Sequence, residues 1–167
     1  MKTPKMFKTI VYFDQLSKEA KERARKWWKD GNDYPFLEES IKEYTTHKLE
    51  KAGYDVSDLK VYYSLSYCQG DGVSFTANLT KGIERYEVNQ RGNYTHEMTM
   101  SVYHEDEDGN ETEEPAILEE MRKIARMVEK MGYSYIDEEN EDEIVDENIT
   151  CNEYTFSLSG ERMDADV

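Results

Sequence analysis

Residues 60–79 read Lys60-Val61-Tyr62-Tyr63-Ser64-Leu65-Ser66-Tyr67-Cys68, then Gln69-Gly70-Asp71-Gly72, then Val73-Ser74-Phe75-Thr76-Ala77-Asn78-Leu79. Apolar residues recur at every second position on each side of the glycine-rich segment. Because successive side chains of a strand point to opposite faces of a sheet, this period of two predicts an antiparallel hairpin with one apolar face.

The turn residues predict the register of this hairpin. A three-residue loop, Gly70-Asp71-Gly72, puts Gly72 at a left-handed position that glycine adopts without steric cost. A loop of two or four residues would instead set Phe75 beside Ser66 or Cys68, on the polar face. The pairs predicted by the three-residue loop are Tyr67 with Phe75, Leu65 with Ala77 and Tyr63 with Leu79.

A second hairpin is predicted further along the chain. Its strands are Glu84–Asn89 and Asn93–Tyr103, and its loop, Gln90-Arg91-Gly92, again has glycine third. The pairs that this loop predicts are Val88 with Tyr94 and Tyr86 with His96.

Helical spacing of apolar residues and capping residues predict the other elements. We expect a strand at 8–13, a helix from Ser17 to Trp28, a helix from Pro35 to a stop at Gly53, a helix from Pro115 to Gly132, a short helix within 137–147 capped by Asp137, and a last strand at 154–158. The predicted fold class is α+β, an antiparallel sheet of four to five strands with three to four helices packed mainly on one face. We expect one domain over residues 1–162 and a frayed tail at 163–167.

The charge of the chain is strongly asymmetric. The 167 residues carry a net charge of −16. Residues 1–83 hold 14 Lys and Arg against 12 Asp and Glu, whereas residues 84–167 hold 7 against 25. A surface with this charge repels nucleic acid and anionic membranes and attracts basic protein surfaces.

Two acidic runs carry the partner prediction. Residues 105–114 hold seven acids and are expected to form a solvated loop, and residues 137–147 hold eight. Spaced carboxylates on a folded surface resemble the charge of duplex DNA, about one per 1.7 Å of axis. The alternative is that the acids form a solvated face that keeps the protein in solution. The predicted partner-binding residues are the acids Glu105, Asp106, Glu107, Asp108, Glu138, Glu139, Glu141, Asp142 and Glu143, with Trp28 and Tyr135 as aromatic anchors.

A small polar site is the competing interpretation. If the two hairpins are neighbours, Asp71 is the base or metal ligand, His96 the acid and Gln69 an orienting amide, with Tyr94 beside them. The turn alone also explains Asp71 and Gln69, and this explanation is favoured. The spacing of His, Cys and Asp predicts no transition-metal site, and no cofactor motif is present.

Several segments resemble a family of uncharacterised bacteriophage proteins. They are Phe13-Asp14-Gln15-Leu16-Ser17-Lys18-Glu19-Ala20 with Trp27-Trp28, Ser66–Phe75, Arg91–His96 and Tyr154–Gly160. The hairpin of that family commonly reads Ser-Gly-Phe-Trp-Ser-Gln-Gly-Asp-Gly-Ala-x-Phe. This chain departs from it at Leu65, where the family usually has Gly or Phe, and at Cys68, where it has Ser. The resemblance implies a phage origin and no agreed activity.

Three functions follow as hypotheses. The first is a phage-type anti-defence inhibitor, anti-CRISPR or anti-restriction, whose acidic surface occupies the nucleic-acid groove of a basic bacterial nuclease or effector complex. The second is a small enzyme or nucleotide-binding protein that uses Gln69, Asp71 and His96. The third is a structural or interaction protein of the phage cycle. With no apolar leader after Met1 and only Cys68 and Cys151 as cysteines, we expect the host cytoplasm.

Overall fold

The structure is a computed structural model, which describes residues 9–92 and 95–164. Four α-helices and seven strands are present in the described residues, and the predicted α+β class is confirmed. The elements in chain order are β1 (Ile10–Tyr12), the 3-10 helix η1 (Phe13–Gln15), α1 (Lys18–Gly31), α2 (Leu37–Lys51), β2 (Asp55–Ser64), β3 (Gly72–Lys81), β4 (Glu84–Gln90), the 3-10 helix η2 (Glu97–Thr99), β5 (Met100–Glu105), β6 (Glu111–Glu113), α3 (Pro115–Glu139), α4 (Asp142–Cys151) and β7 (Thr155–Ser157).

The chain gathers into two compact units. Unit 1 comprises residues 1–34 and 136–167, and unit 2 comprises residues 35–135. Each unit has a core of its own. The expectation of one domain over 1–162 stays a prediction. Of the expected tail at 163–167, Met163 donates its backbone N–H to the carbonyl of Thr155 at 2.9 Å, and residues 165–167 lie outside the described residues.

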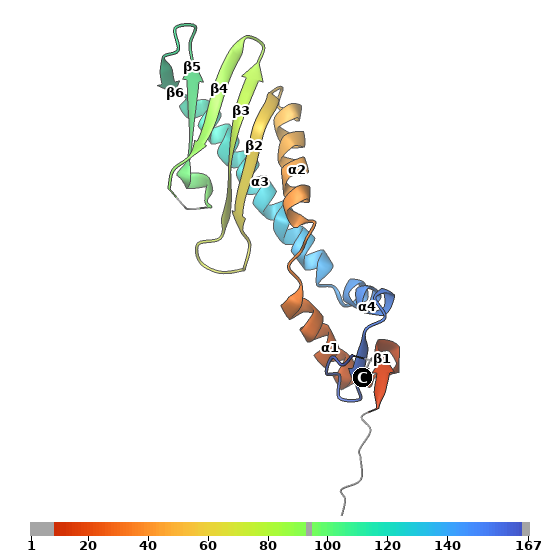
Figure 1. The fold of residues 1–167 in the computed structure, drawn as a ribbon. Coiled ribbons are helices and arrows are strands. Elements are labelled where there is room, and N and C mark those ends of the chain that lie inside the picture. The colour runs from red at the N-terminus through yellow and green to blue at the C-terminus, as the bar shows by residue number, and fades with distance from the viewer. Residues whose placement is uncertain (1–8, 93–94, 165–167) are drawn as a thin grey trace, which may run out of the picture. The chain divides into compact units, whose positions relative to one another are not determined.

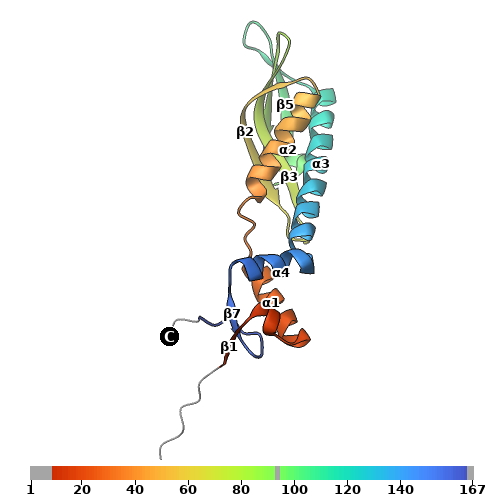
Figure 2. The same cartoon turned by 90° about the vertical axis from the view of Figure 1, so that its right-hand side faces the viewer.

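Unit 2 is built on a five-stranded antiparallel sheet in the order β2-β3-β4-β5-β6. Both α2 and α3 cover one face of this sheet (Figures 1 and 2), as the sequence predicted. The buried apolar side chains of the strands come from alternate positions, which is the pattern of a half-buried sheet. The sheet contributes Val73, Phe75, Ala77, Leu79, Val88, Met100 and Val102, and the two helices contribute Ile41, Leu49, Met121 and Val128.

The first hairpin has the predicted faces and a different register. Val61 pairs with Phe75 and Tyr63 with Val73, so Tyr67 and Leu65 do not pair with Phe75 and Ala77. The three-residue loop was wrong because the strands part at Ser64 and Gly72, which leaves a connection of residues 65–71. From Lys60 to Ser64 the pairing is offset from the predicted one by an even number of residues, so Val61, Tyr63, Val73 and Phe75 keep the predicted face, whereas Leu65 and Tyr67 lie outside the strands.

The second hairpin changes in the same way. Val88 pairs with Val102 and Tyr86 with His104, where the sequence predicted Tyr94 and His96. The connection contains η2 and is closed by the Arg91 N–H, which donates to the Thr99 carbonyl at 2.7 Å. Asn93 and Tyr94 lie outside the described residues.

Gly72 is required by a close approach and does not adopt a left-handed conformation. A Cβ atom added there would lie 2.8 Å from the Thr95 carbonyl oxygen and 2.9 Å from His96 Cδ2. The predicted left-handed glycine was therefore wrong at this position. In the connection of residues 65–71, Gly70 has a positive φ of 97° and Tyr67 one of 57°.

The third helix continues past the glycine that was expected to end it. Gly132 is buried inside α3, and a Cβ atom there would lie 2.4 Å from Leu65 Cδ1. The absence of a side chain admits Leu65, which offsets the cost of about 1 kcal/mol of glycine in a helix. Asp137 lies within α3, and the N-cap of α4 is Glu141, so the predicted cap was wrong.

Unit 1 is a small assembly of short elements. The strands β1 and β7 pair antiparallel, with Val11 opposite Phe156. Ser17 caps α1 as predicted, because its hydroxyl accepts the Ala20 N–H at 3.2 Å. The core of the unit contains Phe13, Leu16, Ala20, Ala24, Val145, Ile149 and Phe156.

Within residues 9–92 and 95–164, no helix combines the length and the apolar character that crossing a membrane requires.

Candidate functional site

The residue at the centre of the predicted polar site, Asp71, closes the connection between β2 and β3. Its carboxylate accepts the backbone N–H of Ser66 at 2.8 Å and that of Cys68 at 3.3 Å. It also accepts the hydroxyls of Ser64, at 3.2 Å, and of Tyr133 on α3. Asp71 therefore does locally what the turn interpretation requires of it.

The same hydrogen bonds set the electrostatics of the loop. The Tyr133 hydroxyl, followed by the donors of Cys68 and Ser66, lowers the pKa of Asp71 to about 2. Burial and then the Asp71 carboxylate raise the pKa of Tyr133. The hydrogen bond to Asp71 raises the pKa of the Cys68 thiol. A carboxylate with such a low pKa is a poor base at neutral pH, and a thiol with a raised pKa is a poor nucleophile.

The other members of the predicted site are placed less favourably for catalysis. His96 lies against Gly72, so the chain does bring it next to the Asp71 loop. Its Nδ1 accepts the Met98 N–H at 3.1 Å, which makes His96 the cap of η2. Gln69 is exposed, and Tyr94 lies outside the described residues. In the part of the chain that the structure describes, no group of three His, Cys, Asp or Glu side chains is arranged to hold a metal ion.

The first acidic run forms an ordered hairpin where an unstructured loop was expected. Strand β5 extends to Glu105 and pairs with β6, and Asp106 shapes the turn between them. Asp106 Oδ1 accepts the N–H groups of Asp108 at 2.9 Å and Asn110 at 2.8 Å. Residues Glu105 to Asp108 are all exposed, and no Lys or Arg of the described residues forms an ion pair with them. We call residues 105–108 the acidic turn.

The second acidic run is partly neutralised within unit 1. Arg25 binds Asp146 through two hydrogen bonds, of 2.6 and 2.7 Å. Asp142 lies 3.8 Å from Arg25 and 3.5 Å from Lys29. Glu138, Glu141 and Glu143 are exposed and Glu139 is half-buried. One of the predicted partner-binding acids, Asp142, is thus already engaged by basic residues of α1.

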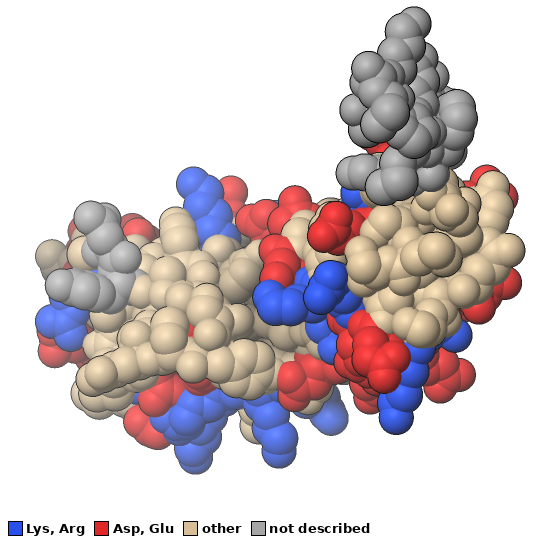
Figure 3. Space-filling view, turned by 90° about the horizontal axis from the view of Figure 1, so that it is seen from below, with Lys and Arg blue, Asp and Glu red and all other residues tan. Residues whose placement is uncertain are grey.

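The face drawn in Figure 3 shows the same mixture of charges. Asp and Glu side chains alternate there with Lys and Arg side chains, and large areas carry neither. The negative charge on this face is therefore interrupted by positive charge. The relevant segments for a basic partner are those whose carboxylates have no cation beside them.

The aromatic anchors predicted from the sequence are mostly packed inside the protein. Trp28 is half-buried and packs against the core of unit 1, beside Tyr154 at a ring distance of 6.1 Å. Tyr135 is half-buried in unit 2. Trp27, which the sequence analysis did not select, is 36% exposed. Tyr133 was also missed, because nothing local indicates a partner 62 residues away.

The chain was compared with known proteins. No family model matches it, and neither a curated protein nor a solved structure shows significant similarity to it.

Proposed function

We propose that this protein inhibits a bacterial nuclease complex by placing its acidic turn in the groove through which the complex binds nucleic acid. One observation supports the proposal above the others. The turn holds four consecutive carboxylates that are exposed and unpaired with described cations, and the Asp106 carboxylate shapes its backbone by accepting two backbone hydrogen bonds. Because the backbone that carries the charges is already folded, a basic groove meets a charge pattern that is partly preorganised.

The acids of the second run, with Trp28 and Tyr135, are a secondary part of this proposal. Glu138, Glu141 and Glu143 are exposed and able to meet a basic surface. Asp142 contributes less, because Arg25 and Lys29 already lie near it. The bacterial nuclease is chosen as the target class because of the sequence resemblance to phage proteins.

The enzyme hypothesis is the weaker proposal. It requires Asp71 to take a proton or a metal ion, and its carboxylate already accepts hydrogen bonds from Ser64, Ser66, Cys68 and Tyr133. The third hypothesis, a structural protein of the phage cycle, has no specific observation in its favour.

The test uses two variants with equal changes of charge. The first carries Glu105→Gln, Glu107→Gln and Asp108→Asn, and spares Asp106 because that residue shapes the turn. The second carries Glu138→Gln, Glu139→Gln and Glu143→Gln. Inhibition of a panel of purified CRISPR effectors and restriction nucleases is measured on duplex DNA for the wild type and both variants.

We expect the wild type to inhibit at least one nuclease. The acidic-turn variant should inhibit that nuclease less than the second variant does. Association should slow as ionic strength rises, because the Debye length shrinks from about 10 Å at 0.1 M salt to about 3 Å at 1 M. Equal inhibition by all three proteins, together with indifference to salt, would contradict the proposal. Both variants should unfold at nearly the wild-type temperature, because exposed charges contribute little to stability.

A further inference from the structure

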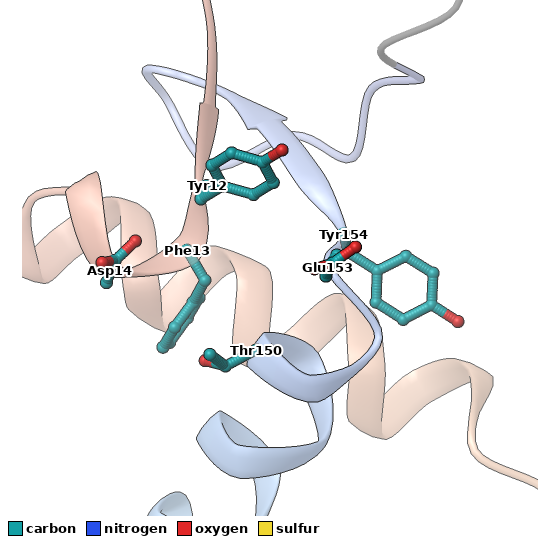
Figure 4. Close-up of a pocket in the computed structure, with 6 residues that line it drawn as sticks. All are labelled: Tyr12, Phe13, Asp14, Thr150, Glu153 and Tyr154. Carbon is teal, nitrogen blue, oxygen red and sulfur yellow. The ribbon is translucent and has the colours of Figure 1, made fainter.

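Unit 1 contains a hollow that none of the hypotheses above uses. Its volume is about 350 Å³, at the lower end of the range of about 300–1,000 Å³ found for small-ligand sites. Figure 4 shows that the residues around it come from the β1–η1 junction, from the last turn of α4 and from the segment that leads into β7. The lining residues are Tyr12, Phe13, Asp14, Thr150, Glu153 and Tyr154.

The aromatic part of the lining is fixed by the core. Phe13 is buried and meets Phe156 edge to face at a ring distance of 6.3 Å. Tyr154 packs edge to face against Trp27 at 5.1 Å, and Arg162 lies over its ring at 4.9 Å. Tyr12 differs from both, because it is 53% exposed and neither a ring nor a cation is described against it. One aromatic face is therefore open to a ligand.

The polar part of the lining is negative. Asp14 and Glu153 are exposed carboxylates, and in the described residues neither forms an ion pair. Arg25 and Arg162 are paired with Asp146 and Asp164. Lys21 and Arg25 lie over the ring of Phe13, at 5.6 and 5.7 Å, and are not paired with either lining carboxylate. The C-terminal end of α4, at Cys151, adds the partial negative charge of a helix end.

Glu153 occupies a backbone position where glycine is usual. Its φ is 55°, and it follows the C-cap Asn152 of α4. The Glu153 N–H donates to the Thr150 carbonyl at 3.0 Å and the Tyr154 N–H to the Ile149 carbonyl at 3.4 Å, the pattern in which a helix ends with a left-handed residue. A glutamate here adopts a backbone conformation that residues other than glycine and asparagine rarely take. A strained residue that lines a hollow is a candidate for function.

We infer that this hollow is a site for an arginine side chain of a partner protein. A guanidinium group is planar, stacks on an aromatic face such as Tyr12 and forms paired hydrogen bonds with carboxylates such as Asp14 and Glu153. The two lining carboxylates and the exposed ring of Tyr12 favour this ligand, and the hollow is large enough to admit one side chain. The inference does not rest on the acidic turn, because every lining residue belongs to unit 1.

The experiment titrates the full chain, labelled with ¹⁵N, with the peptide acetyl-Gly-Arg-Gly-amide. The matched peptide contains citrulline, which has the shape of arginine and no charge. We expect saturable shifts in the amide signals of Tyr12, Asp14, Glu153 and their neighbours with arginine and none with citrulline. Equal affinity for the two peptides, or shifts spread over both units, would overturn the inference.

Two double variants complete the test. Asp14→Asn with Glu153→Gln should weaken binding of the arginine peptide by about tenfold or more, because both carboxylates of the lining lose their charge. Glu147→Gln with Glu161→Gln makes the same change of charge at exposed positions of unit 1 outside the hollow, and should leave the affinity within about twofold. If the two double variants bind equally well, the site is not in this hollow. Unchanged amide spectra away from the hollow show that each variant is folded.

Discussion

The hydroxyl group of Tyr133 on α3 donates a hydrogen bond to the carboxylate of Asp71 in the β2–β3 connection. The ring of Tyr133 also lies 4.6 Å from that of Tyr67 in the same connection. The helix is thereby joined to the loop through a charged hydrogen bond and a ring contact. Asp71 thus organises its own loop and fixes that loop to the helix layer.

Removing the Tyr133 hydroxyl should raise the pKa of Asp71. In the wild type this pKa falls from 3.8 to about 2, so ionised Asp71 stabilises the folded state above about pH 4 and this contribution is lost as the pH falls towards 2. We expect Tyr133→Phe to lower the melting temperature at pH 7 and to have a smaller effect near pH 2. The carboxyl carbon shift of Asp71, followed by NMR against pH, measures the change directly. An unaltered titration curve would show that the hydrogen bond does not set this pKa.

A single methyl group at Gly72 should destabilise the protein. The added Cβ would lie 2.8 Å from the Thr95 carbonyl oxygen, and this backbone must move. We expect Gly72→Ala to lower the free energy of unfolding by about 1–3 kcal/mol, the usual cost of overpacking. The control is Gly31→Ala in the last turn of α1, where nothing lies within 4 Å of the new Cβ atom. The free energy of unfolding of that variant should equal the wild-type value or exceed it by up to about 1 kcal/mol. Urea unfolding of both variants measures the difference.

Replacing Glu153 with glycine should relieve the backbone strain and so stabilise unit 1, and it should weaken the binding of arginine in the hollow. Glycine adopts the observed φ of 55° freely, although it also has more freedom in the unfolded chain. We expect Glu153→Gly to raise the free energy of unfolding by about 0.5–1 kcal/mol. Glu153→Ala removes the same carboxylate and keeps the strain, so its stability should stay near that of the wild type. Equal stability of the two variants would show that the backbone conformation carries no cost.

The ion pair between Arg25 and Asp146 should contribute measurably to the free energy of unfolding. The Arg25 side chain is only 15% exposed and forms two hydrogen bonds with one carboxylate. A double-mutant cycle with Arg25→Met and Asp146→Asn should give a coupling of about 1–2 kcal/mol, above the values found for fully exposed pairs. The matched control is the cycle for Lys26 and Asp30, whose side chains are 75% and 65% exposed, and its coupling should fall near zero. Equal coupling energies in the two cycles would contradict the expectation that the two hydrogen bonds between Arg25 and Asp146 make that pair the stronger one.

Local sequence determined the elements and their faces. The alternation from Val61 to Leu79 predicted two strands with the correct buried side, because the period of side-chain direction in a strand is a local property. Ser17 predicted the start of α1 for the same reason, since a cap is formed with residues three positions away. The α+β class and an antiparallel sheet of four to five strands followed from such patterns, whereas β6 lies where a solvated loop was expected.

Tertiary structure alone decided the register, the helix ends and the site geometry. The β2–β3 connection is long because Asp71 binds Ser66, Cys68 and the distant Tyr133. Prediction of a turn from its own residues takes no account of a partner on another element. Gly132 looked like a helix end, and packing against Leu65 made it a helix interior. The hollow at Asp14 and Glu153 likewise joins residues far apart in the chain. Contacts of this kind depend on which surfaces meet after collapse, so they are absent from any short window of sequence.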